Sequence, residues 1–348
     1  MRWLYSVQTF VLTACGGVMF YLIHFPLPWV LGPLFTFLFI KYVVKGKSLW
    51  YSGLRTPSML IIGYMLGRKF TMNSVQGILA IWPSLVLALF ITLILYAVSV
   101  YLTQALLKIN KTSAYMGCLP AGLTQISVIC EDVKGVDMTA VSLMQTIRVI
   151  TFITVVPFIA IHGLAVTYDT ELLQESYKYE YRDFFRWTVL FAIIYLAVRL
   201  GYKLRIKGNT TILPIIVTAI LVVADVPAPP LPDFIQIAAQ ICMGVQIATT
   251  IQAERLGTFK KLSFFSLLLN LVLIAIFSWA DIYITTLAQT DYLTAFLGTS
   301  LAGTSEMGIA ALQVHADVAK VTIFQLSRTL FIYLIVLPIM IRKIDRRS

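Results

Sequence analysis

A carboxylate in an apolar setting is the first feature of this sequence that could carry chemistry. Glu306 lies in the run Leu301 to Met307, where the neighbouring side chains are small, hydroxylated or apolar. Carboxylates inside membrane segments mark relays for protons and sodium ions, so ion coupling is one interpretation. The other is a structural salt bridge to a buried arginine, and the sequence leaves both open.

Two arginines could supply that partner. Arg148 and Arg328 also lie inside apolar segments, and each follows a glutamine, Gln145 or Gln325, by three residues. A charge at membrane depth costs at least ~2.5 kcal/mol, so each arginine needs a partner or water. They could line a path and attract an anion such as a carboxylate. Alternatively, each could hold a neighbouring loop by donating hydrogen bonds to its carbonyl groups or to Glu306.

These features occur twice, because the sequence is duplicated. Residues 113–126 match residues 294–307 at an offset of 181, and the Asp-to-Gln-to-Arg spacing is 8 and 3 in both copies. A proline follows each arginine, at Pro157 and Pro338. We expect a first membrane repeat at 1–165, a linker at 166–183 and a second membrane repeat at 184–348. Duplications of this length are typical of transporter halves, whereas solenoid repeats have periods of ~20–50 residues.

The candidate solute or ion path combines the glycine-containing tips of the two copies with the following Gln and Arg. Its residues are Gly122, Thr124, Gln125, Gln145, Arg148, Gly303, Thr304, Ser305, Glu306, Gln325 and Arg328. Asp137 and Asp317 are expected to give structural support. The two glycines are expected to permit sharp turns. Glu306 has Gln125 as its counterpart, so the copies diverged at this position.

Composition indicates the elements that must position these residues. Of 348 residues, 59% are hydrophobic and 12% charged, against roughly 45–50% and about 25% in soluble domains. Each copy has six apolar segments, and the fifth, near 113–130 and 292–314, has glycine and small polar residues at its centre. Broken backbone at membrane depth must be buried in protein or line water. We therefore expect an all-α polytopic membrane protein of two inverted repeats, each with about five transmembrane helices and one re-entrant or broken helical hairpin.

The charge pattern predicts the orientation. With both hairpins re-entrant, most of the 27 lysines and arginines fall on one side, as the positive-inside rule requires. Both termini are then cytoplasmic in a multi-pass protein of the inner (cytoplasmic) membrane. Residues 1–23 are expected to form an uncleaved first span.

Several other chemistries are disfavoured. The net charge of +11 is spread over short loops, so we expect the lipid bilayer and no nucleic acid as a partner. The cysteines and histidines show no metal-ligand spacing, and no nucleotide loop or Ser-His-Asp arrangement is present. We expect no enzyme activity, no metal and no cofactor. Whether copies form a homo-oligomer stays open.

The doubled pattern of a small-residue tip, Asp, Gln-x-x-Arg and Pro resembles the membrane AbrB-duplication family across nearly the whole chain. Members are often labelled AbrB family transcriptional regulators or ammonia monooxygenases. The family tip usually reads Pro-Gly-Gly and then Ser-Glu-Met. The first copy here has lost the Glu and Met, at Gln125 and Ile126, and the second has lost the Pro, at Leu301.

Two functions follow as hypotheses. The first is a secondary transporter of a small organic solute, with an anion as one option, coupled to H+ or Na+. The alternative, which the family label implies, is a membrane-embedded regulator or sensor that alters gene expression without binding DNA directly.

Overall fold

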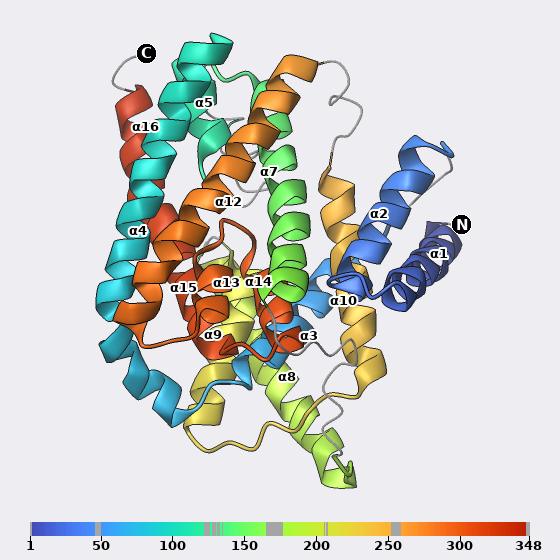
Figure 1. The fold of residues 1–348 in the computed structure, drawn as a ribbon. Coiled ribbons are helices and arrows are strands. Elements are labelled where there is room, and N and C mark those ends of the chain that lie inside the picture. The colour runs from blue at the N-terminus through green and yellow to red at the C-terminus, as the bar shows by residue number, and fades with distance from the viewer. Residues whose placement is uncertain are drawn as a thin grey trace.

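In the computed structural model, the regular elements of the described residues are all helices (Figure 1). It describes residues 2–45, 50–121, 126, 130, 133, 135–164, 177–204, 206, 208–251 and 259–345. The helices are α1 (Arg2–Leu22), α2 (Pro28–Tyr42), η1 (Ser52–Leu54), α3 (Arg55–Gly67), α4 (Met72–Leu107), α5 (Lys111–Cys118), α7 (Met138–Ile159), η2 (Ala160–Leu164), α8 (Tyr181–Lys203), α9 (Asn209–Val223), α10 (Asp233–Thr250), α12 (Lys260–Ala288), α13 (Tyr292–Thr299), α14 (Thr304–Gln313), α15 (Val318–Phe331), η3 (Ile332–Val336) and α16 (Leu337–Asp345). The predicted fold class is confirmed at this level.

Several helices are suited to a membrane. Among the described residues, five apolar stretches are long enough to cross one, at residues 80–107, 138–164, 181–203, 260–288 and 318–342. Shorter apolar helices cover residues 6–22, 28–42 and 209–223, below or near the ~20 residues that a perpendicular crossing needs. The chain therefore fits a multi-pass membrane protein, while the count of ten spans stays a prediction.

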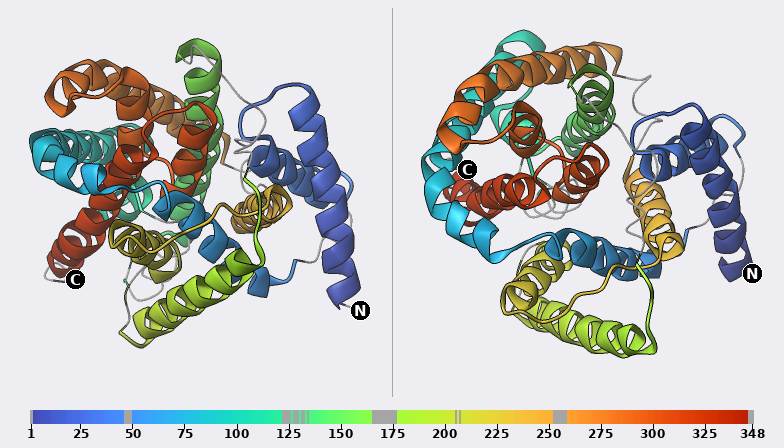
Figure 2. Two further views of the ribbon diagram at one scale, coloured as in Figure 1. Left: turned by 90° about the horizontal axis from the view of Figure 1, so that it is seen from below. Right: turned by 60° about the horizontal axis from the view of Figure 1, so that its bottom comes forward.

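The helices pack in two groups that do not coincide with the two halves of the sequence. The scaffold group contains α1, α2, α3, α8, α9 and α10, and the core group contains α4, α5, α7 and α12 to α16. Figure 2 shows the core group as a ring of helices beside the scaffold group. Each group takes its helices from both halves of the chain, so neither half can form its packed structure alone.

Within the scaffold group, the pairing of helices is reciprocal. α3 of the first half packs on α9 of the second, and α10 of the second half packs on α2 of the first. Glycines make both crossings close: a Cβ at Gly67 would lie 2.6 Å from Thr218 Cβ, and one at Gly244 would overlap the carbonyl oxygen of Val30. In lipid, no hydrophobic driving force holds helices together. Small residues instead allow the close van der Waals packing that does.

Two pairs of long helices in the core group run in opposite directions (Figure 1). α4 rises from the bottom of the view to the top, whereas α12 descends from the top to the bottom. α7 descends, whereas α15 and α16 rise toward the C-terminus. The sequence places α4 with α12 and α7 with α15 as counterparts, so matching helices are antiparallel in this structure.

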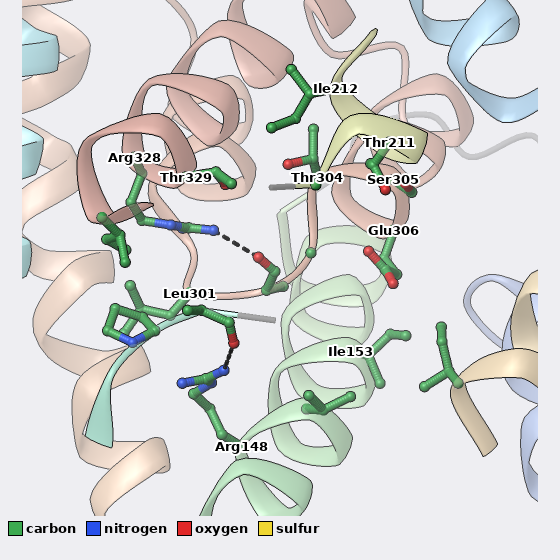
Figure 3. A pocket seen from close by; sticks show the side chains of 18 of the residues that line it. Arg148, Ile153, Thr211, Ile212, Leu301, Thr304, Ser305, Glu306, Arg328 and Thr329 are labelled. Atoms are coloured by element: carbon green, nitrogen blue, oxygen red, sulfur yellow. Dashed lines mark hydrogen bonds between the residues drawn. The ribbon is translucent and has the colours of Figure 1, made fainter. Parts of the chain in front are cut away.

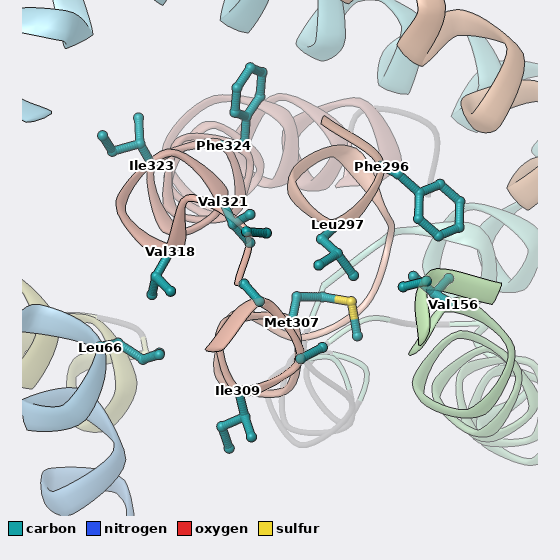
Figure 4. Packing of buried hydrophobic residues seen from close by; sticks show 14 of the residues in the cluster. Leu66, Val156, Phe296, Leu297, Met307, Ile309, Val318, Val321, Ile323 and Phe324 are labelled. Carbon is teal, nitrogen blue, oxygen red and sulfur yellow. The ribbon is translucent and has the colours of Figure 1, made fainter. Parts of the chain in front are cut away.

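The fifth apolar segment of the second half is a helical hairpin. α13 ends at Thr299, residues 300–303 are non-helical, and α14 starts at Thr304. The segment then returns to the level at which it started. The backbone N–H of Asp317, after α14, donates to Oγ1 of Thr294, near the start of α13, at 2.9 Å. Figure 4 shows the packing that holds the hairpin, with Met307 and Leu297 facing Val321 of α15.

The first half has a matching segment. α5 ends at Cys118 and gives way to a non-helical stretch. The backbone N–H of Asp137 donates to Ser113 Oγ at 2.7 Å, so this segment also returns to where it began. Residues 122–125 lie outside the described residues.

Capping residues fix the bases of both hairpins. Asn110 and Asp291 cap α5 and α13 by accepting from the backbone N–H three residues later, each at 2.8 Å. Asp137 and Asp317 cap α7 and α15 in the same way. Such side chains satisfy N–H groups that a helix start leaves unpaired. The residues expected to give structural support therefore lie at helix N-termini.

Candidate functional site

The first Gln-x-x-Arg motif lies against the break after α5. Gln145 Nε2 donates to the carbonyl oxygens of Met116 at 2.8 Å and Leu119 at 3.0 Å. Arg148 donates from Nη1 to Leu119 O and from Nη2 to Ala121 O. Carbonyl groups at a helix end have no partner within the helix, so α7 supplies the donors that the broken backbone lacks.

The second motif repeats the arrangement on the break after α13. Gln325 Nε2 donates to Leu297 O at 2.8 Å and Ser300 O at 3.0 Å. Arg328 donates from Nη1 to Ser300 O and from Nη2 to Ala302 O. All three acceptors lie 181 residues beyond those in the first copy, so the duplication extends to individual hydrogen bonds. These are the contacts that the loop-holding interpretation of the arginines describes.

The two breaks border one cavity of about 230 Å³. Pro120 and Ala121 line it from the first hairpin, and residues 301–306 line it from the second. The scaffold group closes it with residues of α3, α9 and α10, and Arg148 and Arg328 contribute from α7 and α15. In Figure 3, the two guanidinium groups flank the break that carries Leu301, and Glu306 lies across the cavity from them. The cavity is therefore a meeting place of both halves and both packing groups.

The cavity is predominantly electropositive. Two helices begin at it, α9 after Gly208 and α14 after Gly303, and Arg55 lines it from α3. Neither N-cap glycine supplies a side-chain cap. Helix N-termini carry free N–H groups and a partial positive charge, which favour anions. With the arginines, they make a site suited to a negatively charged group.

Glu306 is the one acidic residue among the described residues that line this cavity. It is half-buried. Within the described part of the chain, no ion pair joins it to Arg148 or Arg328, since both arginines are directed to carbonyl groups. The salt-bridge interpretation of Glu306 therefore has no support in this structure.

The expectation for Gly303 needs correction. Its φ of −80° and ψ of 149° are extended values that any residue adopts, so no left-handed turn requires glycine there. Instead, a Cβ at this position would overlap Oε2 of Glu306. Glycine at 303 therefore leaves room for the Glu306 carboxylate.

Comparison with known proteins now places the chain in a family. The model of the family described as "AbrB: Transition state regulatory protein AbrB" matches residues 29–345. The chain belongs to the AbrB family.

Two relatives resemble this AbrB-family chain along its length. One is "Putative regulator AbrB" of Escherichia coli (strain K12), 24% identical over 341 residues that cover 93% of the chain and 92% of the relative. The other is "Uncharacterized protein YhjN" of Bacillus subtilis (strain 168), 21% identical over 352 residues that cover 94% of the chain and 90% of the relative. The family resemblance expected from the doubled motif is confirmed.

The structure gathers about half of the residues expected to form the path in this AbrB-family chain. Arg148, Gly303, Thr304, Ser305, Glu306 and Arg328 line the cavity. Gln145 and Gln325 instead bind carbonyl groups behind the breaks. Gly122, Thr124 and Gln125 lie outside the described residues.

Sequence reasoning missed the scaffold side of the cavity. Arg55, Thr211 and Gln246 line it from α3, α9 and α10. Arg55 looks like an ordinary loop cation at the start of an apolar segment, and the other two lie in apolar segments without a doubled motif. One signal was available in the sequence: Gly208 stands just before an apolar run, and glycine is among the residues found at helix starts. In the structure its φ is 74°, a left-handed value that favours glycine.

Proposed function

We propose that this protein is a secondary transporter of a small organic anion, and that the cavity between the hairpin breaks binds the solute. The observation that carries the proposal is the convergence of two interrupted helices, two helix N-termini and three arginines on one cavity. Transporter sites are built where broken helices direct their N-terminal ends at anionic groups near the middle of the membrane.

The size of the cavity supports a small solute. Its volume is about 230 Å³, whereas pockets for drug-sized ligands measure ~300–1,000 Å³. A carboxylate is the favoured anionic group, because Arg55 and the N–H groups at the starts of α9 and α14 can share its two oxygens. Glu306 would then disfavour a second negative charge, so a solute with one carboxylate suits the site best.

The proposal includes the architecture. Opposed directions of α4 against α12 and of α7 against α15 support inverted repeats in the membrane. Two returning hairpins support re-entrant loops that approach from opposite faces. In this arrangement, the protein is a multi-pass protein of the cytoplasmic membrane with both termini in the cytoplasm, and uptake is coupled to H+ or Na+.

Flux into proteoliposomes tests the proposal. Purified protein is first screened for thermal stabilisation by a panel of small mono- and dicarboxylates, amino acids and neutral polyols. Labelled forms of the stabilising compounds are then offered to proteoliposomes with an imposed proton or sodium gradient. We expect monocarboxylates to stabilise the protein and to accumulate only when one of the gradients is present.

Arg55→Gln is the informative variant, because Arg55 borders the cavity without holding a hairpin. It should weaken stabilisation by monocarboxylates while leaving the unliganded protein as stable as before. Arg199→Gln, on the exposed surface of α8, is the matched control. Uptake that is indifferent to both gradients, or stabilisation by neutral polyols alone, would count against an ion-coupled anion transporter.

A further inference from the structure

A second acidic residue of the core group lies behind the hairpin break and is absent from the cavity. Asp281 is fully buried in α12, about 10 Å from the end of that helix at 1.5 Å per residue. Thr299 Oγ1, at the last residue of α13, donates to Asp281 Oδ1 at 2.8 Å. The other oxygen, Oδ2, is buried without a hydrogen-bond partner. Burial with an unpaired oxygen disfavours the charged form of a carboxyl group.

The surroundings of Asp281 supply no compensating charge. α4, which packs against α12, has no charged residue from Met72 to Leu107. α13 presents Tyr292, whose hydroxyl donates to Ser278 O at 2.6 Å. The charged residue of α7 is Arg148, which binds the other hairpin. Arg328 donates to backbone carbonyl oxygens, among them that of Thr299 at 3.4 Å, and forms no ion pair with Asp281. Among the described residues, therefore, nothing pairs with this carboxylate as an ion.

The duplication shows that this acid is a special feature of the second copy. In the first copy, the last residue of the first half-helix is Cys118, 181 residues before Thr299. Cys118 Sγ lies 3.4 Å from Thr103 Oγ1 of α4, so the corresponding contact is uncharged. A hairpin can therefore be held in place without a carboxylate. The second copy has acquired two, Asp281 and Glu306, one on each side of its break.

A short polar route connects Asp281 to the break. Thr299 binds Asp281 through its side chain and Arg328 through its backbone carbonyl. A cavity of about 10 Å³ lies between Thr92, Thr299 and Arg328, close to the space that one water molecule requires. Two hydrogen bonds, both made by Thr299, thus link Asp281 to the arginine that holds the cavity-lining backbone.

We propose that Asp281 is the residue that binds and releases the coupling proton, which deepens the proposed transport function and rests on it. Water on one side of the membrane supplies the proton, Oδ2 holds it as an O–H bond, and water on the other side receives it. A proton needs one carboxylate, whereas hard cations gather about six oxygen ligands. Glu306 faces the solute, and Asp281 carries the proton.

Infrared spectroscopy tests proton binding without any solute. Difference spectra of the purified protein are recorded between mildly acidic and mildly alkaline buffers, in which surface carboxylates stay ionised. We expect a carbonyl band of a protonated carboxyl group that is lost in Asp281→Asn. Asp225→Asn, an exposed aspartate, is the matched control and should keep the band. A band that persists unchanged in Asp281→Asn overturns the proposal.

Two further variants cover the case in which Asp281→Asn does not fold. Asp281→Glu should keep the band at a displaced frequency. Thr299→Val removes the one hydrogen-bond donor to Asp281 and should displace the band. If neither variant alters the band, Asp281 is not the proton-binding residue.

Transport measurements separate this proposal from the transport function itself. A gradient of one pH unit can drive one-proton symport to about a tenfold solute ratio. In Asp281→Asn that ratio should fall to about one, while exchange of labelled for unlabelled solute continues. If no solute is transported but the band still depends on Asp281, the proton site stands and the transport function fails. If transport proceeds and Asp281→Asn still accumulates solute tenfold, the transport function stands and the proton site fails.

Discussion

The backbone N–H of Asp137 donates to Ser113 Oγ at 2.7 Å, although the two residues are 24 positions apart in the chain. A continuous helix of that length would separate them by ~36 Å. Thr294 and Asp317 form the same bond in the second half, at 2.9 Å. Each glycine-containing segment therefore returns to its own starting level, which places its broken centre inside the protein and leaves its carbonyl groups to be satisfied by Gln and Arg.

Arg328→Lys should destabilise the protein while keeping the positive charge. Lysine cannot reproduce the planar fork that serves Ser300 O and Ala302 O together. Ser300 O keeps the hydrogen bond from Gln325 Nε2, so one carbonyl, that of Ala302, is left unpaired, and we expect a loss of roughly 1–3 kcal/mol. Tryptophan fluorescence during thermal unfolding in detergent measures it. Arg148→Lys should behave alike because the contacts are duplicated, and the exposed Arg199→Lys should have no effect. Equal stability of all three variants would show that charge alone matters.

Glu306→Gln should separate function from stability. No ion pair within the described residues depends on this carboxylate, so we expect the unfolding free energy to change by less than about 0.5 kcal/mol. Because Glu306 disfavours a second negative charge on the solute, dicarboxylates should compete with the labelled monocarboxylate more than about tenfold better in this variant, equivalent to roughly 1.4 kcal/mol of binding free energy. Flux and thermal unfolding are measured on the same preparations. A strongly destabilised variant would instead indicate a structural role.

Gly244→Ala should weaken the crossing of α10 on α2. The added Cβ would overlap the carbonyl oxygen of Val30, and backbone cannot move aside as a side chain can. We expect a loss of about 1–3 kcal/mol from overpacking. Gly77→Ala in α4 is the control, since no atom lies within 4 Å of its Cβ position. That variant should gain up to about 1 kcal/mol from helix propensity. Similar midpoints of thermal unfolding for both variants would contradict the close crossing.

Inverted insertion predicts opposite accessibility for the bases of the two hairpins. In a variant without its four cysteines, single cysteines are placed at exposed Lys111, Gly135 and His315. A membrane-impermeant maleimide should reach the first two positions only from the cytoplasmic face. It should reach the third only from the opposite face. Labelling of all three from one face would show parallel halves and would remove the basis for a central solute site.

The sequence by itself determined the local features of this structure. Apolar runs, helix-capping side chains and glycine-rich centres act within a few residues, so they fix the helices and the two interruptions without reference to the rest of the chain. The doubled Asp-to-Gln-to-Arg spacing also determined the family and pointed to Arg148, Arg328 and Glu306 as buried polar groups.

Only the tertiary structure decided what those groups touch. The arginines turn to carbonyl groups because the breaks leave acceptors within reach, and Gly303 is required by the position of Glu306 rather than by a turn. Asp281 is close to the end of an apolar run, where an acid would ordinarily meet water. It is buried because α4, α7 and α13, from both halves of the chain, pack around α12. Burial depends on neighbours distant in sequence, so local pattern could not reveal it.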